Sequence, residues 1–135
     1  MIDKEIEIFN YVAVPLRAEF SGIYIIGEAT SSPSQFPAVT FVEKSNTVRR
    51  DARDFDNIEN QANVMYEVNV YSNLTSGKKQ QAKNIFKLID SKMSTLGFER
   101  TFGQPIENLA DTTIYRYTAR YIASIGKDNY VYGGK

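Results

Sequence analysis

Residues 63–72, with the sequence NVMYEVNVYS, have the clearest strand pattern in the chain. Apolar and mixed positions alternate along them, which is typical of a strand with one face on a core. The apolar positions are Val64, Tyr66, Val68 and Val70. The opposite face carries Glu67 and Asn69, so we expect it to be the more polar one.

The segment that follows predicts an amphipathic helix over about residues 78–96. Its apolar positions recur at helical spacing, its lysines lie mainly off that stripe, and Gly97 is placed to cap the C-terminus. The stripe consists of Ala82, Ile85, Phe86, Ile89, Met93 and Leu96. We expect the part of this stripe from Ile85 to Met93 to be buried together with Val68 and Val70.

A second amphipathic helix is predicted near the N-terminus, over about residues 3–19. Asp3 is placed to cap it, because a carboxylate can accept hydrogen bonds from the first N–H groups of a helix. The apolar positions at helical spacing are Ile2, Ile6, Phe9, Val12 or Ala13, Leu16 and Phe20. We expect Ile6 and Phe9 to contribute to the core.

Four further segments predict strands, at residues 22–28, 38–43, 98–106 and 112–125. The resulting element order is α-β-β-β-α-β-β. This order predicts an α+β fold with a mostly antiparallel sheet and two helices on one face. We expect one domain spanning residues 1–135.

The last predicted strand has two different faces. Tyrosines and alanines share one face, whereas Arg116 and Arg120 lie on the other. If this strand shares a sheet with residues 63–72, the two arginines and Glu67 form a polar, charge-paired face. A face that only carries solvated, matched charges would explain the same pattern.

The composition excludes several kinds of site. The 135 residues include no Cys and no His, so thiolate and imidazole metal ligands and the commonest general base are missing. We therefore expect no catalytic site, no cofactor and no metal. The 16 basic and 16 acidic residues balance, which argues against nucleic-acid binding as the main activity. We also expect no membrane segment and no signal peptide.

A long charged loop is predicted at residues 45–62, between the second and third strands, and a flexible polar tail at residues 126–135. The loop acids lack the spacing of a calcium-binding loop, and they balance the nearby arginines. A loop with both signs of charge suits a complementary protein surface. The predicted contact residues are Arg49, Arg50, Arg53, Asp54, Phe55, Asp56, Ile58 and Glu59, with the two apolar members as anchors.

The chain also resembles a known family over most of its length. The most suggestive segments are FPAVTFVEKSN at residues 36–46, VNVYSN at 68–73 and IDSKMSTLGFERT at 89–101. With EIEIFNYVAVPL, GIYIIGEAT and TTIYRYTARYIA, they resemble the tail-terminator proteins of long-tailed bacteriophages and prophages, also called tail-completion or head–tail joining proteins. None of these segments is a catalytic motif.

The resemblance implies a structural protein of the virion tail, assembled in the cytoplasm of the bacterial host. Its copies would form a ring, expected to be a hexamer, that caps the tail tube and stops polymerisation. The implied partners are other copies of the chain, the tail tube protein and the head–tail connector protein, and DNA would only pass through the lumen. The loop at residues 45–62 would be a docking loop.

The ring interface needs two different patches that meet, and Arg116, Arg120 and Glu67 are the candidate interface residues. The long final strand is a candidate for pairing at a sheet edge. Two alternatives remain open. One is another head–tail connector protein, such as a stopper or adaptor. The other is a small cytoplasmic enzyme or ligand-binding domain, which a deep pocket with converging polar groups would favour.

Overall fold

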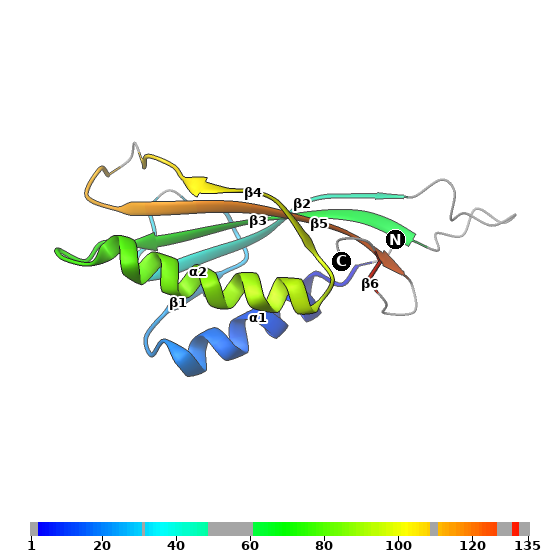
Figure 1. Ribbon diagram of the computed structural model, residues 1–135, viewed down its shortest axis with the longest axis horizontal. Helices are drawn as coiled ribbons and strands as arrows, with labels where there is room; N and C mark the ends of the chain where they lie inside the picture. The colour runs from blue at the N-terminus through cyan, green and yellow to red at the C-terminus, as the bar shows by residue number, and fades with distance from the viewer. Residues whose placement is uncertain (1–2, 31, 49–60, 109–110, 127–130, 133–135) are drawn as a thin grey trace, which may run out of the picture.

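The chain forms one mixed sheet with two helices on one face (Figure 1). The computed structural model describes residues 3–30, 32–48, 61–108, 111–126 and 131–132. The elements are α1 (Glu5–Glu19), β1 (Tyr24–Ile26), β2 (Ala38–Val48), β3 (Gln61–Ser72), α2 (Lys78–Thr95), β4 (Glu99–Pro105), β5 (Tyr115–Gly126) and β6 (Val131–Tyr132). The strand order is β1-β2-β3-β5-β4, and β6 also pairs with β5. Of the described strand pairs, only β1 and β2 run parallel, so the predicted α+β fold with a mostly antiparallel sheet is confirmed.

The central strand β3 follows the predicted alternation. Val64, Tyr66, Val68 and Val70 are all buried against the helices. The ring of Tyr66 stacks on that of Phe41 in β2, with 5.1 Å between the ring centroids. It also makes an edge contact with the ring of Phe98, with 5.6 Å between the centroids. These aromatic contacts fix the relative positions of β2, β3 and the segment after α2, since such pairs add to the energy of burial.

Helix α2 covers the same face with the predicted stripe. Ala82, Ile85, Phe86, Ile89 and Met93 are buried, and Leu96 packs at the edge of the core. Gly97 has a φ of 91°, and the N–H of Phe98 donates to the carbonyl of Met93 at 3.0 Å. This is the glycine-capped helix end that the sequence predicts, because a left-handed residue is least strained when it is glycine.

Helix α1 exposes part of the stripe that the sequence assigns to the core. Its buried residues are Ile8, Val12, Ala13 and Leu16. Ile6 is 76% exposed, so its predicted burial is wrong, whereas Phe9 is partly buried and meets Phe41 edge-on at 6.2 Å. Apolar residues surround much of this helix, and Val14 is also exposed. The packing partners, rather than the spacing alone, therefore select which side is buried.

The hairpin formed by β2 and β3 is longer than predicted. Residues 45–48 pair with residues 62–65, beyond an irregularity in register between Glu43 and Ser45. The predicted loop at 45–62 is therefore too long at both ends. Lys44 lies in the irregularity and is exposed. Its charge interrupts the apolar pattern, so the sequence does not predict that the strand continues beyond it. The predicted contact residues, from Arg49 to Glu59, lie outside the described residues.

The C-terminal segment also departs from the prediction. Gly126 is the last residue of β5, and β6 pairs with Ser124 and Ile125, so the expected flexible tail at 126–135 is wrong for these positions. The final long strand β5 lies between β3 and β4 and is not an edge. The edges of the main strand order are instead β1 and β4, and in β4 every residue except Phe102 is exposed. The described ranges contain no helix that is long and apolar enough to cross a membrane.

Candidate functional site

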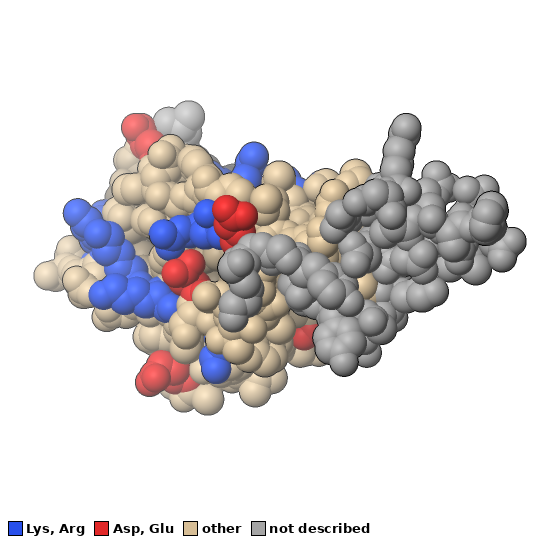
Figure 2. Space-filling model, turned by 45° about the vertical axis from the view of Figure 1, so that its right-hand side comes forward, with Lys and Arg blue, Asp and Glu red and all other residues tan. Residues whose placement is uncertain are grey.

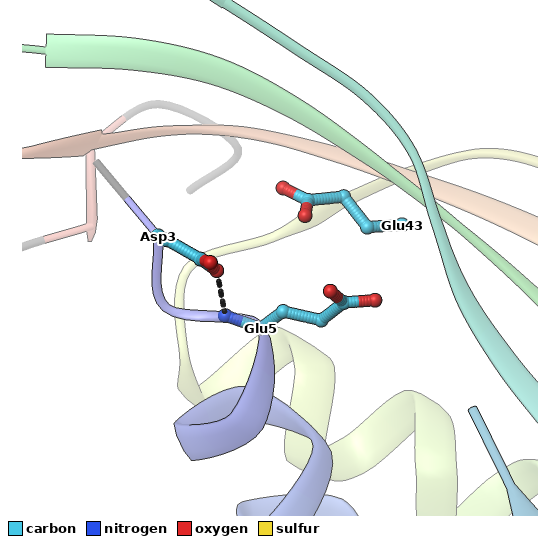
Figure 3. A group of neighbouring side chains, drawn as sticks. All are labelled: Asp3, Glu5 and Glu43. Carbon is cyan, nitrogen blue, oxygen red and sulfur yellow. Dashed lines mark hydrogen bonds between the residues drawn. The ribbon is translucent and has the colours of Figure 1, made fainter. Parts of the chain in front are cut away.

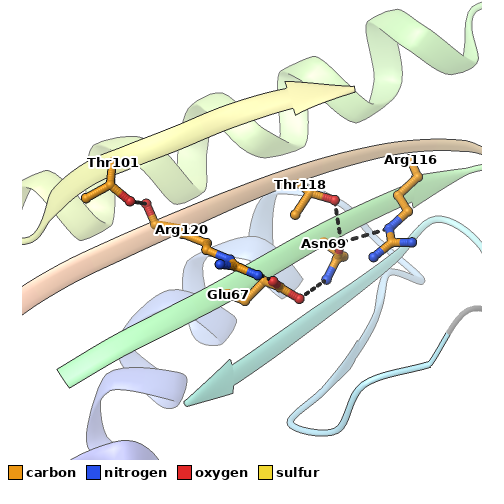
Figure 4. A network of polar contacts seen from close by, with 6 residues as sticks. All are labelled: Glu67, Asn69, Thr101, Arg116, Thr118 and Arg120. Carbon is orange, nitrogen blue, oxygen red and sulfur yellow. Dashed lines mark hydrogen bonds and ion pairs between the residues drawn. The ribbon is translucent and has the colours of Figure 1, made fainter. Parts of the chain in front are cut away.

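The sheet face away from the helices carries the polar residues predicted from the strand pattern. Strands β3 and β5 pair in antiparallel register along their whole length. Glu67 lies opposite Arg120, Asn69 opposite Thr118 and Tyr71 opposite Arg116. The structure therefore brings Arg116, Arg120 and Glu67 together on one face, as predicted (Figure 4). We refer to this surface as the outer face.

Asn69 is the centre of this network. Its side chain is only 3% exposed, and its Oδ1 accepts hydrogen bonds from Arg116 Nε at 2.9 Å and from Thr118 Oγ1 at 2.6 Å. Its Nδ2 donates to Glu67 Oε1 at 3.3 Å (Figure 4). A buried amide needs such partners, and here they join both strands into one hydrogen-bonded unit. The sequence gives one hint of this role, because asparagine is uncommon within strands.

The ion pair between Arg120 and Glu67 forms the exposed end of the network. Arg120 Nε lies 3.0 Å from Glu67 Oε2, and the side chains are 47% and 14% exposed, respectively. A pair this accessible to water contributes about 0–1 kcal/mol to stability. Its main effect is to hold one side of the Arg120 guanidinium in place while the other side faces solvent.

Arg116 occupies the opposite, more enclosed end. Its guanidinium lies 5.8 Å from the centre of the Tyr71 ring, within the range of a cation–π contact. The Tyr71 hydroxyl donates to the carbonyl of Thr30 at 2.5 Å. Burial raises the pKa of Tyr71, and the charge of Arg116 partly opposes that shift. A small apolar cluster of Ala38, Tyr71 and Ile114 covers this end of the outer face.

A hollow of about 410 Å³ lies between the network and β4. It is lined by Met65, Glu67, Thr101, Phe102, Ile106, Arg116, Thr118 and Arg120. The polar groups of Asn69, Glu67 and the two arginines are bonded to one another, instead of converging on an empty centre. Arginine and aromatic side chains beside apolar ones are typical of protein interfaces. This arrangement favours a protein-binding surface over a small-molecule site.

Charge is mixed over the part of the surface that Figure 2 shows in colour. In Figure 2, basic side chains gather toward the end at which α2 begins, and acidic side chains lie among them. The formal net charge is zero. Mixed charge of this kind suits recognition of a complementary protein surface, because it sets orientation more than overall attraction.

No protein-family model matches the chain, and no curated protein sequence matches it significantly.

Proposed function

We propose that this protein is a tail terminator of a long-tailed bacteriophage or prophage. Its copies form a ring, expected to be hexameric, on the last ring of the tail tube, where they stop polymerisation and present a surface to the head connector. The protein then belongs to the virion tail and assembles in the host cytoplasm. The proposal rests on the sequence resemblance, and the observation that supports it is the outer face with its prearranged arginines beside an exposed sheet edge.

The outer face has the properties needed on one side of a ring interface. In a ring, one patch of each subunit meets a different patch of the next, so each patch must hold a defined shape by itself. Asn69 and Glu67 position the two arginines within a single chain. The side of Arg120 that faces solvent can then receive a carboxylate from a neighbour, since a guanidinium has several donors.

Strand β4 supplies the second element of the proposed interface. Its exposed edge can pair with, or be covered by, a neighbouring subunit. The register is irregular between Arg100 and Phe102, and the strand ends at Pro105. Irregularities and proline limit uncontrolled pairing along an edge. Such an edge is suited to a closed ring rather than to an open fibre.

A charge-reversal experiment tests the proposal. We expect the wild-type protein to cap purified tail tubes as a ring, detected by native mass spectrometry and electron microscopy. The variant R116E/R120E should remain folded by circular dichroism but fail to cap tubes. K79E/K87E is the matched control, because both lysines are exposed on α2, which covers the other face, and the charge change is equal.

Two results would defeat the proposal. One is a wild-type protein that never associates with tail tubes or with itself. The other is an R116E/R120E variant that caps tubes as well as the control does. The position of the protein in assembly intermediates separates a terminator from another connector protein. A terminator is found on tails that lack heads, whereas a stopper or adaptor is found on heads that lack tails.

A further inference from the structure

Three carboxylates converge where α1 begins, on the helix side of the sheet (Figure 3). Asp3 precedes the helix, Glu5 is its first residue, and Glu43 comes from β2, just before the irregularity in register. Their ligand oxygens all lie within 4.8 Å of one another. Asp3 is exposed, and the other two are half-buried.

The local hydrogen bonds orient these carboxylates without neutralising them. Asp3 Oδ1 accepts the backbone N–H of Glu5 at 3.1 Å, and Asn46 Nδ2 donates to Glu43 Oε1 at 3.2 Å. The adjacent Lys4 has its ammonium 4.0 Å from Glu7, which lies outside the cluster. Among the ion pairs of the described residues, none includes Asp3, Glu5 or Glu43. Within the described part of the chain, three carboxylates therefore lie together without a cationic side chain bound to them.

Tyr66 provides an independent observation at the same place. It is the cross-strand partner of Glu43, and its side chain is completely buried. Its hydroxyl has no hydrogen-bond partner among the described residues. Burial raises the pKa of this hydroxyl, and the negative charges of Glu43, Glu5 and Asp3 raise it further. A buried hydroxyl without a partner is unfavourable, because it gives up its hydrogen bonds to water on folding and gains none in return.

We propose that Asp3, Glu5 and Glu43 bind one hard divalent cation of the calcium class. Carboxylate oxygens are the ligands that such ions prefer. The separation of the ligand oxygens, at most 4.8 Å, fits calcium, because Ca–O bonds of about 2.3–2.6 Å place ligands on opposite sides of the ion about 5 Å apart. Magnesium is the less suitable ion, because it requires near-ideal octahedral geometry with bonds of about 2.0–2.1 Å and retains several of its waters.

The cation explains both unusual features of the site. Its two positive charges offset most of the three negative ones, and water molecules complete its coordination. One of those waters is the acceptor that the Tyr66 hydroxyl lacks among the described residues. The bound ion ties the start of α1 to β2 and so stabilises the folded chain by mass action. This inference does not depend on the proposed tail function.

Calcium titration of the full-length protein by isothermal calorimetry tests the site. We expect saturable binding of one Ca²⁺ per chain, and weaker binding of Mg²⁺. Replacement of Glu43 by Gln or of Glu5 by Gln should weaken Ca²⁺ binding by about ten-fold or more, since each removes one charged ligand. The control E7Q makes the same charge change on the same helix, at a side chain that is 69% exposed and outside the cluster.

Terbium luminescence adds a readout that depends on Tyr66. Tb³⁺ binds at oxygen sites that accept calcium and emits when a nearby tyrosine is excited, so Y66F should lose most of the emission. Circular dichroism verifies that each variant is folded. If E43Q does not fold, the Ca²⁺ affinity of E5Q tests the site instead. The proposal is overturned if millimolar Ca²⁺ shows no saturable binding, if E7Q weakens binding as much as E5Q does, or if Mg²⁺ binds more tightly than Ca²⁺.

Discussion

The two faces of the sheet are built from the same strands, yet different forces hold their side chains. On the helix face of β3, Val64, Tyr66, Val68 and Val70 are buried with the stripe of α2. On the outer face of the same strand, Glu67 and Asn69 form a hydrogen-bonded network with β5. Apolar burial provides most of the stability of a fold, whereas polar networks provide defined geometry. The helix face therefore fixes the fold, and the outer face holds polar side chains in a defined arrangement.

The largest effect is expected on the helix face. Phe86 of α2 is 7% exposed, and its ring lies 4.6 Å from that of Tyr117. The variant F86A should lower the free energy of unfolding by about 3–5 kcal/mol, because it removes buried surface and leaves a cavity. Urea denaturation measures the change. The exposed neighbour Lys87 gives the control K87A, and a near-neutral F86A would contradict the assignment of this helix face to the core.

An intermediate effect is expected where the outer face is buried. The variant N69A removes the acceptor shared by Arg116 and Thr118. It should lower the free energy of unfolding by about 1–3 kcal/mol, since polar groups are left without partners. N73A changes the same residue type at an exposed position just after β3 and should be close to neutral. Equal free energies of unfolding for the two variants would mean that the network does not stabilise the fold.

The sequence predicts the helix face well because its signals are local. The alternation in residues 63–72 and the helical spacing from Ala82 to Met93 each exclude other structures. Helix α1 is less well predicted because Ile6 and Val14 are as apolar as the residues that are buried. Its orientation depends on contacts with α2 and β2, which no local pattern contains.

The candidate sites show the same limit. Alternation places Arg116, Arg120 and Glu67 on the outer face, but the central role of Asn69 depends on the register between β3 and β5. The cluster of Asp3, Glu5 and Glu43 joins two segments that are distant in sequence. No spacing rule for metal ligands connects them, because the fold alone brings β2 to the start of α1.

A smaller stability effect is expected from the connection between β2 and β3. Replacing residues 49–60 by a short Gly-Ser turn should change the free energy of unfolding by about 1 kcal/mol or less, because closure entropy varies slowly with loop length. Under the proposed function, the same deletion should abolish tail completion. Thermal unfolding and a tail assembly assay measure the two effects. A variant that unfolds, or one that still completes tails, would contradict this prediction.

The smallest stability effect is expected from the ion pair at the exposed end of the outer face. A double-mutant cycle with E67A, R120A and the combined variant should give a coupling energy below about 1 kcal/mol, since the Arg120 side chain is 47% exposed and water screens the pair. Urea denaturation of the four proteins measures this coupling. Under the proposed function, R120A should nevertheless weaken ring formation strongly. The expected loss in the free energy of association is as large as the loss in the free energy of unfolding caused by a core variant. A coupling energy above about 2 kcal/mol would show that the outer face contributes to stability as the helix face does, and the contrast between the two faces would then fail.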